Sequence, residues 1–510
     1  MTMTDILEKD VGPAPATDNG AIADASAAEV REKIIRILSL KKLDRVQKYT
    51  RIAVEVTRCL QRRGRFYFHA EHRDFDTAMF FDKVEKILTP VRDDRFTGWL
   101  SLWTATNRAD PLFKYLRTEV ENVALSPDES SGIIPERFWA RRDDVIYVSC
   151  GDGQLVKITG KETKLADNGT DDVLFPYGST LIPWELTAPR DPFETCSLFR
   201  DIACTATHGP DLIRLFVLSL FTNPRSKPPL VASGEIGSGK TRMAKGIAEL
   251  LGIIERVSKV EEAKESDFWA AIDQGGVLIL DNADTKVTWL ADAIANAATD
   301  GCKIARRLYT NSETVIQRAR SWLVITSATP MFASDAGLAD RLLVVRMKRR
   351  QGDTADSQLS EEIAAHRDSG LSFIAHTLSK ALADKREPPT ALNSRHPDFA
   401  SFGARIGRAI GREAEIIAAL QAAEADKARF CLENDYVGAA LLATINQEAF
   451  KGSAAQLLER IRAVDPELEK LTAKKLGKKL TTHWAHIEGV FQASKRVAHG
   501  GAYEYELRAR

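Results

Sequence analysis

The stretch from residue 234 to residue 241 holds the side chains best suited to chemistry. It fits the pattern G-x-x-x-x-G-K-[ST] without a mismatch, through Gly234, Glu235, Ile236, Gly237, Ser238, Gly239, Lys240 and Thr241. Backbone N–H groups of such a loop point inward at phosphates, and a helix that starts directly after it adds its dipole. Lys240 is predicted to reach the β- and γ-phosphates, and Thr241 to hold Mg²⁺ through its hydroxyl. The pattern therefore predicts a site for a nucleoside triphosphate, with ATP favoured.

Two elements must flank this loop if it is to bind phosphate. Residues 229–233 are apolar and predict a short buried strand, and residues 242–251 predict a helix with one apolar face. Phosphate binding needs this order of strand, loop and helix. Arg242 is the first residue after the loop and is included among the predicted nucleotide contacts.

A second strand supplies an acid. Residues 276–281 are a continuous apolar run that ends in Asp281, which predicts a central parallel strand buried on both faces. Ligands bind at the carboxyl edge of such sheets, so Asp281 is predicted to complete the Mg²⁺ shell with Thr241. Many ATPases place a second acid next, to orient the attacking water, but here Asn282 follows and an acid returns only at Asp284. Three alternatives stay open: Asp284 serves, an acid comes from elsewhere, or hydrolysis is slow.

A third apolar strand is predicted to end in the hydroxyls of Thr326 and Ser327. A polar group at this strand end is placed to contact the γ-phosphate or its water. Before that strand, residues 303–309 and 313–318 flank a turn and predict a β-hairpin with basic residues on both arms. After it, Arg341 opens another apolar strand, where it is placed to act as an arginine finger on the ATP of a neighbouring subunit.

The order and spacing of these motifs resemble the superfamily 3 helicase branch of the AAA+ ATPases. The nearest members are replicative primase-helicases of phages, plasmids and mobile elements. The resemblance implies an α/β P-loop NTPase core of AAA+ type with a parallel sheet, and a hexameric ring whose hairpins grip DNA in a central pore. It assigns the sensor position to Ser327, the finger to Arg341 and the pore hairpin to Lys303, Arg306 and Arg307. Asn282 and Ser327 depart from the family pattern.

Composition shifts divide the chain into five predicted segments. These are a disordered leader at 1–27, an α+β N-terminal domain at 28–191, the P-loop domain at 192–350, a helical lid or extension at 351–450 and a winged helix at 451–510. The strands predicted in the N-terminal domain include residues 99–103 and 173–175. Asp74 and Asp76 resemble the paired carboxylates of a primase-polymerase site, but nothing else there supports nucleotidyl transfer.

The last sixty residues follow the order helix, helix, hairpin that is typical of a winged helix. The helices are predicted at 454–463 and 472–487, and the strands at 490–493 and 502–507. Lysines on the second helix stand where phosphate contacts would be made: Lys474, Lys475, Lys478 and Lys479. DNA binding is favoured over a solvated, lysine-rich helix in a protein-contact module.

Composition narrows the class of protein. The chain has 71 Lys and Arg and 71 Asp and Glu, so a polyanion must bind a local patch rather than the whole surface. Its six cysteines include no C-x-x-C pair, which argues against a disulfide framework or a zinc site and suits a reducing cytosol. No N-terminal signal pattern is recognised, and the most apolar run, residues 212–221, is too short to span a bilayer. A cytoplasmic protein with no membrane partner is predicted.

Two functional hypotheses follow. The first is an ATP-dependent DNA helicase or translocase that acts as a homo-oligomeric ring in the replication of a phage-like or mobile element. The alternative is an ATP-switched DNA-binding regulator or assembly factor without unwinding activity, which the Asn282 substitution supports. A primase activity of the N-terminal domain is a third, weaker hypothesis.

Overall fold

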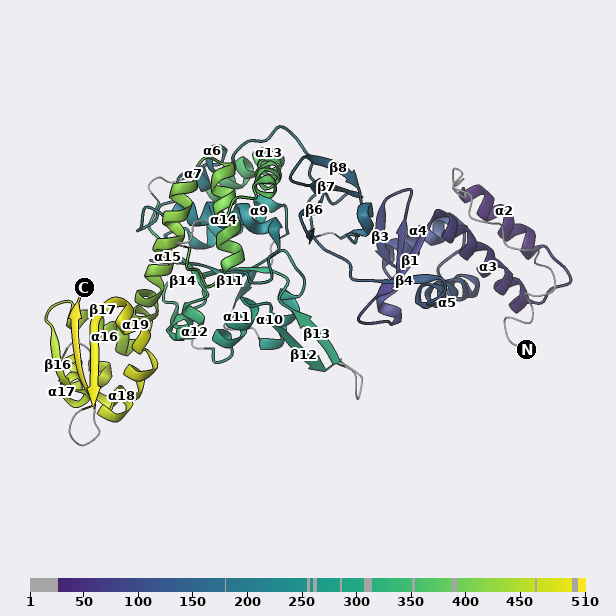
Figure 1. The fold of residues 1–510 in the computed structure, drawn as a ribbon. Coiled ribbons are helices and arrows are strands. Elements are labelled where there is room, and N and C mark those ends of the chain that lie inside the picture. The colour runs from purple at the N-terminus through teal and green to yellow at the C-terminus, as the bar shows by residue number, and fades with distance from the viewer. Residues whose placement is uncertain are drawn as a thin grey trace. The chain divides into compact units, whose positions relative to one another are not determined.

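The computed structural model of this chain describes residues 26–178, 180–254, 257–259, 264–284, 287–306, 314–350, 354–387, 392–463, 466–497 and 503–510. The chain divides into two compact units, Met1–Pro135 and Glu136–Arg510 (Figure 1). Most of the predicted leader lies outside the described residues. Its end is already structured, because Ser26 caps helix α2 by accepting a hydrogen bond from Glu29 N.

From residue 26 onward, the first unit has four α-helices and a four-stranded sheet. The helices are α2 (Ala27–Leu38), α3 (Arg45–Arg63), α4 (Asp94–Thr104) and α5 (Pro111–Leu125). The strands are β1 (Gly64–His69), β2 (Met79–Asp82), β3 (Ile87–Pro90) and β4 (Ser130–Ile133), in the order β3-β2-β1-β4. Only the β1–β4 pair is parallel. Leu60, Leu100 and Leu116 are fully buried and join α3, α4 and α5 in one core.

The strand predicted at residues 99–103 is wrong, because this segment lies in α4. Phe96, Leu100 and Trp103 are buried at helical spacing, and Asp93 caps the helix by accepting from Arg95 N at 2.8 Å. Aromatic and apolar residues close together favour a strand by local preference. The burial of one helical face decides the outcome instead.

The second unit begins earlier than the predicted P-loop domain. An antiparallel sheet of β5 (Trp139–Arg142), β6 (Val145–Ser149), β7 (Gln154–Ile158) and β8 (Thr163–Asp167) precedes residue 191. Its apolar side chains share one core with the helices around the P-loop. Trp139 packs on Phe221, with ring centroids 5.3 Å apart. The unit boundary therefore lies at Pro135 rather than at the predicted residue 191.

The strand predicted at residues 173–175 is also wrong. This segment is buried but irregular. Both backbone polar groups of Phe175 bond to the side-chain amide of Asn168, each at 2.9 Å. The amide therefore takes the place of a neighbouring strand.

A five-stranded parallel sheet forms the centre of the second unit. Its strands are β9 (Leu230–Gly234), β10 (Val257–Lys259), β11 (Val277–Asp281), β14 (Trp322–Ser327) and β15 (Leu343–Met347), in the order β10-β11-β14-β9-β15. Leu230 and Ala232 face a core shared with α8 (Gly209–Ser219) and α9 (Lys240–Leu251). Val231 faces a second core shared with α10 (Glu265–Ile272) and α11 (Leu290–Ala297). Helices thus cover both faces of the sheet, as a parallel sheet requires.

Three long helices follow the sheet: α13 (Asp356–Ala383), α14 (Pro397–Ala409) and α15 (Glu413–Glu433). The sequence predicts two separate helices here, at residues 359–365 and 373–383, but α13 runs unbroken through both. Gly370 lies at the predicted break, and a Cβ there would come within 3.1 Å of Leu250 Cδ1 on α9. The glycine therefore permits close helix packing rather than ending the helix. Among the described helices, none is both long and apolar enough to cross a membrane.

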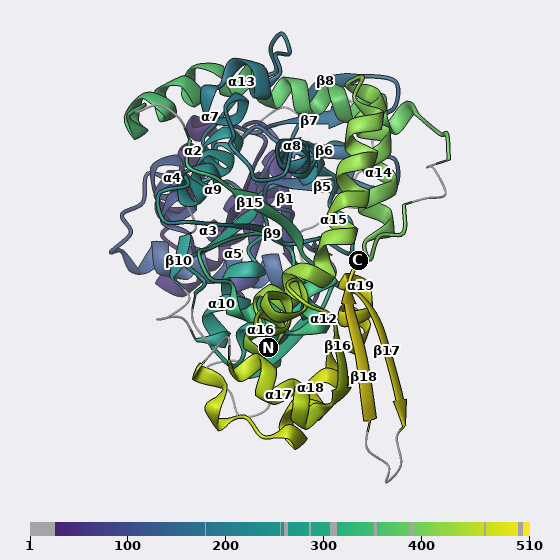
Figure 2. The same cartoon turned by 90° about the vertical axis from the view of Figure 1, so that its left-hand side faces the viewer.

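The chain ends in a small module of helices and one sheet (Figure 2). Its elements are α16 (Tyr436–Ile445), β16 (Phe450–Ser453), α17 (Ala454–Arg462), α18 (Ala473–Thr482), α19 (Trp484–Val490), β17 (Phe491–Val497) and β18 (Tyr503–Ala509). The sheet order is β16-β18-β17, with both pairs antiparallel. The core of this module already includes Leu432 and Val437, so it starts before the predicted residue 451. The helix predicted at 472–487 is divided at His483 into α18 and α19.

The boundary at Pro135 can be tested with two fragments. We expect residues 136–510 to fold alone, with a thermal transition close to that of the full chain. We expect residues 192–510 to precipitate or to melt at a much lower temperature, because this cut removes buried Phe138, Trp139 and Trp184 from the core. Each such loss costs about 1.5–3 kcal/mol of burial. Circular dichroism melting checks this, and equal melting of the two fragments would contradict it.

Candidate functional site

The loop between β9 and α9 has the geometry that its sequence predicts. Strand β9 ends at Gly234 and helix α9 begins at Lys240. Gly237 and Gly239 have φ of +82° and +81°, a backbone region that favours glycine. At Gly234 the limit is space, because a Cβ would lie 2.2 Å from Met347 O. The loop therefore presents the first N–H groups of α9, which have no partner inside the helix, beside the end of the sheet.

Lys240 folds back over the loop. Its Nζ donates to Gly234 O at 2.7 Å and to Glu235 O at 2.8 Å, and the residue is only 7% exposed. Burial lowers the pKa of Lys240, and the carboxylates of Asp284 and Asp281 act against this decrease. The ammonium is thus held by carbonyl groups that a phosphate oxygen could replace.

Asp281 joins three segments at one oxygen atom. Its Oδ1 accepts from Thr241 Oγ1 at 2.7 Å and from Thr326 Oγ1 at 2.6 Å. Thr241 lies on α9 and Thr326 on β14, the strand between β9 and β11. Adjacent hydroxyl and carboxylate oxygens are the hard ligands that Mg²⁺ prefers, so Thr241 and Asp281 fit this ion.

Asp284 is the second acid near Lys240, and its orientation is fixed. Its Oδ1 accepts from Ser327 Oγ at 2.5 Å, from Ala328 N at 2.7 Å and from Thr329 N at 3.0 Å. Burial raises the pKa of Asp284, but these hydrogen bonds and the charge of Lys240 outweigh it and hold the pKa below its usual range. Ser327 is fully buried and contacts Asp284, so its role here is to position that carboxylate.

Asn282 has a left-handed backbone, with φ of +52°. Its N–H donates to Thr326 Oγ1 at 3.1 Å, and Ala283 N donates to Thr326 O at 2.9 Å. The chain therefore turns sharply after β11, and this turn is what brings Asp284 to the end of β14. Asn adopts such a backbone more readily than Glu does. The left-handed backbone at position 282 thus gives a conformational reason for Asn, rather than an acid, at this position.

Two cavities lie beside the loop. One, of about 240 Å³, is lined by Gly239, Arg242, Ile202 and Leu359 among others. The second, of about 590 Å³, is lined by Glu235, Ala328, Arg346 and Lys348 among others.

Arg242 faces the smaller cavity but is already paired. It forms two hydrogen bonds of 2.9 Å with the carboxylate of Glu249 and one of 3.0 Å with Ser360 on α13. Arg242, a predicted nucleotide contact, therefore also links α9 to α13 through its hydrogen bonds. Among the other predicted loop contacts, Ile236 is 92% exposed and Ser238 is buried.

Arg341 lies at the amino-terminal end of the parallel strands, whereas the loop lies at their carboxyl-terminal end. Leu343 of β15 pairs with Leu230, the first residue of β9, whereas the loop follows Gly234 at the other end. A five-residue strand spans roughly 16 Å, so the two sites are separated by about that length. Arg341 therefore cannot serve the loop of its own chain, and the sequence prediction of a role between subunits is compatible with this position.

His396 holds the backbone at Arg341. Its Nε2 lies 2.8 Å from Arg341 O, and its Nδ1 lies 2.6 Å from Ser226 Oγ. A carbonyl only accepts, so Nε2 carries the proton and Nδ1 accepts from the hydroxyl. Burial lowers the pKa of His396 to about 4, although the bond to Arg341 O acts in the opposite direction.

The predicted hairpin is present as β12 (Cys302–Arg306) paired antiparallel with β13 (Thr314–Arg318). It extends away from the central sheet beside α10 (Figure 1). Lys303 forms an ion pair of 2.9 Å with Glu265 on α10. Arg307 and the side chain of Arg306 lie outside the described residues.

The four C-terminal lysines differ in their surroundings. Lys474, Lys475 and Lys478 are exposed on α18, opposite the buried Leu476. Lys479 instead pairs with Asp435, and its Nζ lies 4.2 Å from the centre of the Tyr436 ring. Three of these lysines therefore offer a basic surface, and Lys479 has a structural contact.

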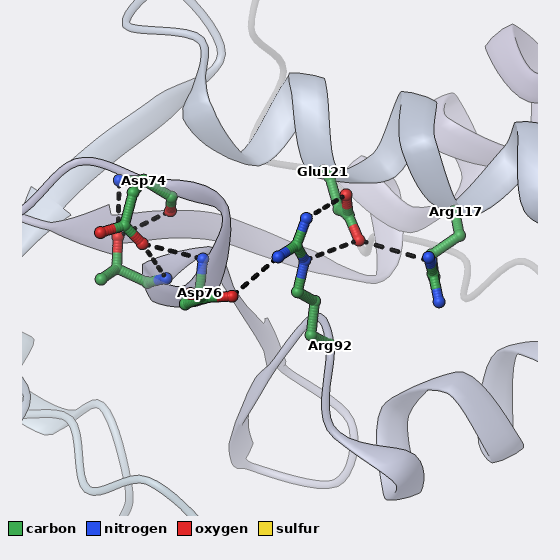
Figure 3. A network of polar contacts seen from close by, with 6 residues as sticks. Asp74, Asp76, Arg92, Arg117 and Glu121 are labelled. Carbon is green, nitrogen blue, oxygen red and sulfur yellow. Dashed lines mark hydrogen bonds and ion pairs between the residues drawn. The ribbon is translucent and has the colours of Figure 1, made fainter. Parts of the chain in front are cut away.

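Asp74 and Asp76 do not form an open pair of carboxylates (Figure 3). Asp74 Oδ1 accepts from the backbone N–H groups of Asp76 and Thr77 and caps a short 3-10 turn. Asp76 pairs with Arg92 at 2.7 Å, and Arg92 also pairs with the buried Glu121 at 3.1 Å. These contacts are structural and give the primase hypothesis no support.

Fold and site together define a mixed α/β protein whose five-stranded parallel sheet is compatible with a P-loop core. Residues 205–428 match the model of a family described as "Actinomycete integrative conjugative element replication protein". The matched region contains the loop at 234–241, all five strands of the central sheet and most of α15. No curated protein matches the chain.

Solved structures give distant matches. "The A form apo structure of NrS-1 C terminal region-CTR" has 10% sequence identity and a TM-score of 0.42, covering 90% of this chain and 98% of that chain. "The apo structure of NrS-1 C terminal region (305-718)" has 9% identity and a TM-score of 0.41, covering 89% and 98%.

His396 predicts a pH dependence of stability. In the unfolded chain the His396 imidazole has its ordinary pKa near 6.5, and in the folded chain its pKa is about 4. Between these values the unfolded state holds more protons, so the free energy of unfolding falls as the pH falls, by up to about 3 kcal/mol. Urea unfolding between pH 7 and pH 4.5 measures it. We expect His396→Gln to flatten this dependence, and equal slopes for both proteins would contradict it.

Proposed function

We propose that this protein is an ATP-dependent DNA helicase or translocase that acts in the replication of a mobile element. The observation that carries the proposal is the convergence of Lys240, Thr241, Asp281 and Asp284 at the carboxyl edge of the parallel sheet. The match of residues 205–428 to a replication-protein family of integrative conjugative elements supports the biological context.

Two fold assignments belong to this proposal. The first is an AAA+ type of P-loop domain, supported by a parallel sheet in which β14 lies between the loop strand β9 and the acid strand β11. The second is a C-terminal winged helix, supported by the order α16, β16, α17, α18, α19, β17, β18 and the sheet order β16-β18-β17. In this assignment α18 is the recognition helix, and the β17–β18 hairpin is the wing.

Phosphate binding follows from the loop. A triphosphate at the N-terminus of α9 would exchange the carbonyl partners of Lys240 for phosphate oxygens, while the first N–H groups of the helix donate to the same oxygens. Thr241 and Asp281 would hold Mg²⁺, which neutralises charge on the β- and γ-phosphates. The smaller cavity would take the nucleoside, with the apolar side chains of Ile202 and Leu359 against the base.

Asp284 is the residue that we assign to activation of water. Its Oδ1 is occupied by three donors, which leaves Oδ2 to accept a hydrogen bond from the attacking water. The water oxygen bonds to the γ-phosphorus as its proton passes to Asp284 Oδ2, and the bond to the β,γ-bridging oxygen breaks. ADP and phosphate leave, and Asp284 then returns the proton to solvent. Ser327 acts through Asp284 as a positioning residue.

Assembly into a ring, with six subunits as the family resemblance implies, is part of the proposal. Arg341 sits about one strand length from the loop of its own chain, so it can only reach a triphosphate held by another copy. DNA would contact the exposed lysines of α18 and the β12–β13 hairpin.

The role of Asp284 can be separated from folding by Asp284→Asn. The amide oxygen still accepts from Ser327 and the two N–H groups, so only the charge is lost. We expect ATP affinity to change by less than about threefold and kcat to fall by about 10²–10⁴-fold. Asp292→Asn, an exposed acid on α11, is the matched control. An unchanged kcat for Asp284→Asn would show that the acid comes from elsewhere.

The shared site predicts complementation. Lys240→Ala and Arg341→Ala should each lack ATPase activity alone, and an equimolar mixture should regain part of it. The reason is that an intact Lys240 from one variant then meets an intact Arg341 from the other. The double variant mixed with Arg341→Ala should regain nothing. Activity of Arg341→Ala alone at the wild-type rate would exclude the finger.

Unwinding of a forked DNA and DNA-stimulated hydrolysis test the motor itself, with Lys240→Ala as the inactive control. The competing function is an ATP-switched DNA-binding regulator or assembly factor, which Asn282 favours. It predicts slow turnover without DNA stimulation, together with a change of oligomeric state on binding ATP alone. That pair of results would replace the helicase proposal.

A further inference from the structure

Three metal-ligating side chains meet where α15 joins the C-terminal module. They are Cys431 on α15, His483 between α18 and α19, and His486 on α19. Each offers one ligand atom, and these atoms lie within 4.8 Å of one another. All three residues are buried, with exposures of 0%, 8% and 8%.

One buried nitrogen of this cluster has no hydrogen-bond partner, and a second has only a weak contact. Nδ1 of His486 is buried and has no hydrogen-bond partner among the described residues. Nδ1 of His483 lies 3.9 Å from Cys431 Sγ, a weak contact. A buried nitrogen without a partner costs about 1–3 kcal/mol, which a ligand bound at Nδ1 would offset.

A carboxylate faces the other ring nitrogen of each histidine. His486 Nε2 lies 3.4 Å from Asp340 Oδ1, and His483 Nε2 lies 3.9 Å from Asp435 Oδ2. At 3.4 Å the Asp340 carboxylate favours a proton on Nε2 of His486, which leaves Nδ1 of that ring free to coordinate. The 3.9 Å at His483 is too long for a hydrogen bond, and Asp435 Oδ2 is also paired with Lys479. The pairing of ligand histidines with carboxylates is the usual outer shell of a zinc site.

We propose that Cys431, His483 and His486 bind a Zn²⁺ ion. One thiolate sulfur and two imidazole nitrogens are ligands that zinc prefers, and a fourth position stays open to water. Tetrahedral zinc at the usual bond lengths places sulfur and nitrogen about 3.5 Å apart, so Cys431 and His483 need to approach by only a few tenths of an ångström. Binding releases the thiol proton to solvent.

Such an ion would fix the C-terminal module to the central domain. Phe430 belongs to the core on one face of the parallel sheet, and Leu432 to the core of the module, so Cys431 lies at their junction. Asp340, which faces His486, directly precedes Arg341. The metal would therefore hold the α18–α19 turn against the segment that carries Arg341. This inference does not depend on ATP binding.

Metal content tests the proposal directly. The full chain, freed of any purification tag, is dialysed with ZnCl₂ and desalted, and its zinc is measured by mass spectrometry. We expect about one zinc ion per chain in wild type and at least a tenfold decrease in His483→Gln/His486→Gln. Cys196→Ser, at a buried cysteine outside the cluster, should keep the wild-type content.

Cobalt gives a second readout that does not rely on comparing folded variants. Co²⁺ titrated into wild type and Cys196→Ser should produce a thiolate-to-cobalt charge-transfer band, which Zn²⁺ then displaces. Cys431→Ser should lose that band. Asp340→Asn should weaken zinc affinity about 10–100-fold. Wild type with neither bound zinc nor a cobalt band, or Cys431→Ser with an unchanged band, would overturn the proposal.

Discussion

The carboxylate of Asp281 is the contact on which the site depends. One of its oxygens accepts hydrogen bonds from Thr241 and Thr326, and so joins α9, β11 and β14. This is possible because β9, β14 and β11 are parallel neighbours whose carboxyl ends meet at one edge. A slip of β11 by one residue would turn Asp281 to the opposite face of the sheet. The helices on both faces prevent such a slip by burying the alternating apolar residues of each strand.

The turn after β11 gives a physical reason for the unusual acid pattern. Asn282 takes a left-handed backbone, which lets Ala283 N pair with Thr326 O and carries Asp284 to the end of β14. The same turn that disfavours Glu at position 282 therefore delivers an acid two residues later. Ser327, a departure from the family pattern at its own position, is the side chain that holds this acid. The two departures from the family pattern, Asn282 and Ser327, are thus linked through Asp284: the turn at Asn282 places this acid, and Ser327 donates a hydrogen bond to it.

Helix α15 connects the central domain with the C-terminal module. Arg346 on β15 pairs with Asp426 and Glu433, and its guanidinium lies over the Phe430 ring. Two residues after Phe430, the helix contributes Leu432 to the core of the module. Helix α15 therefore contacts both strand β15 and the core of the module. The cluster of Cys431, His483 and His486 lies at this connection.

Local patterns determined the phosphate loop, the acid strand and the hairpin, because the spacing of glycines and the runs of apolar residues are readable within ten residues. The helix at residues 94–104 was not readable in this way, since only packing of Phe96, Leu100 and Trp103 against α2 and α3 outweighs their strand preference. The boundary at Pro135 likewise depends on which core the β5–β8 sheet shares.

Which side chains from distant parts of the sequence come into contact was decided by the tertiary structure alone. Thr326, rather than Ser327, contacts Asp281, because sheet register sets which hydroxyl meets the carboxylate. The absence of a C-x-x-C pair argued against zinc, yet Cys431 meets two histidines more than fifty positions away. Only H-x-x-H at 483–486 was visible in the sequence. The sequence by itself determined what the local chemistry could be, and the packing of remote segments decided which of those groups work together.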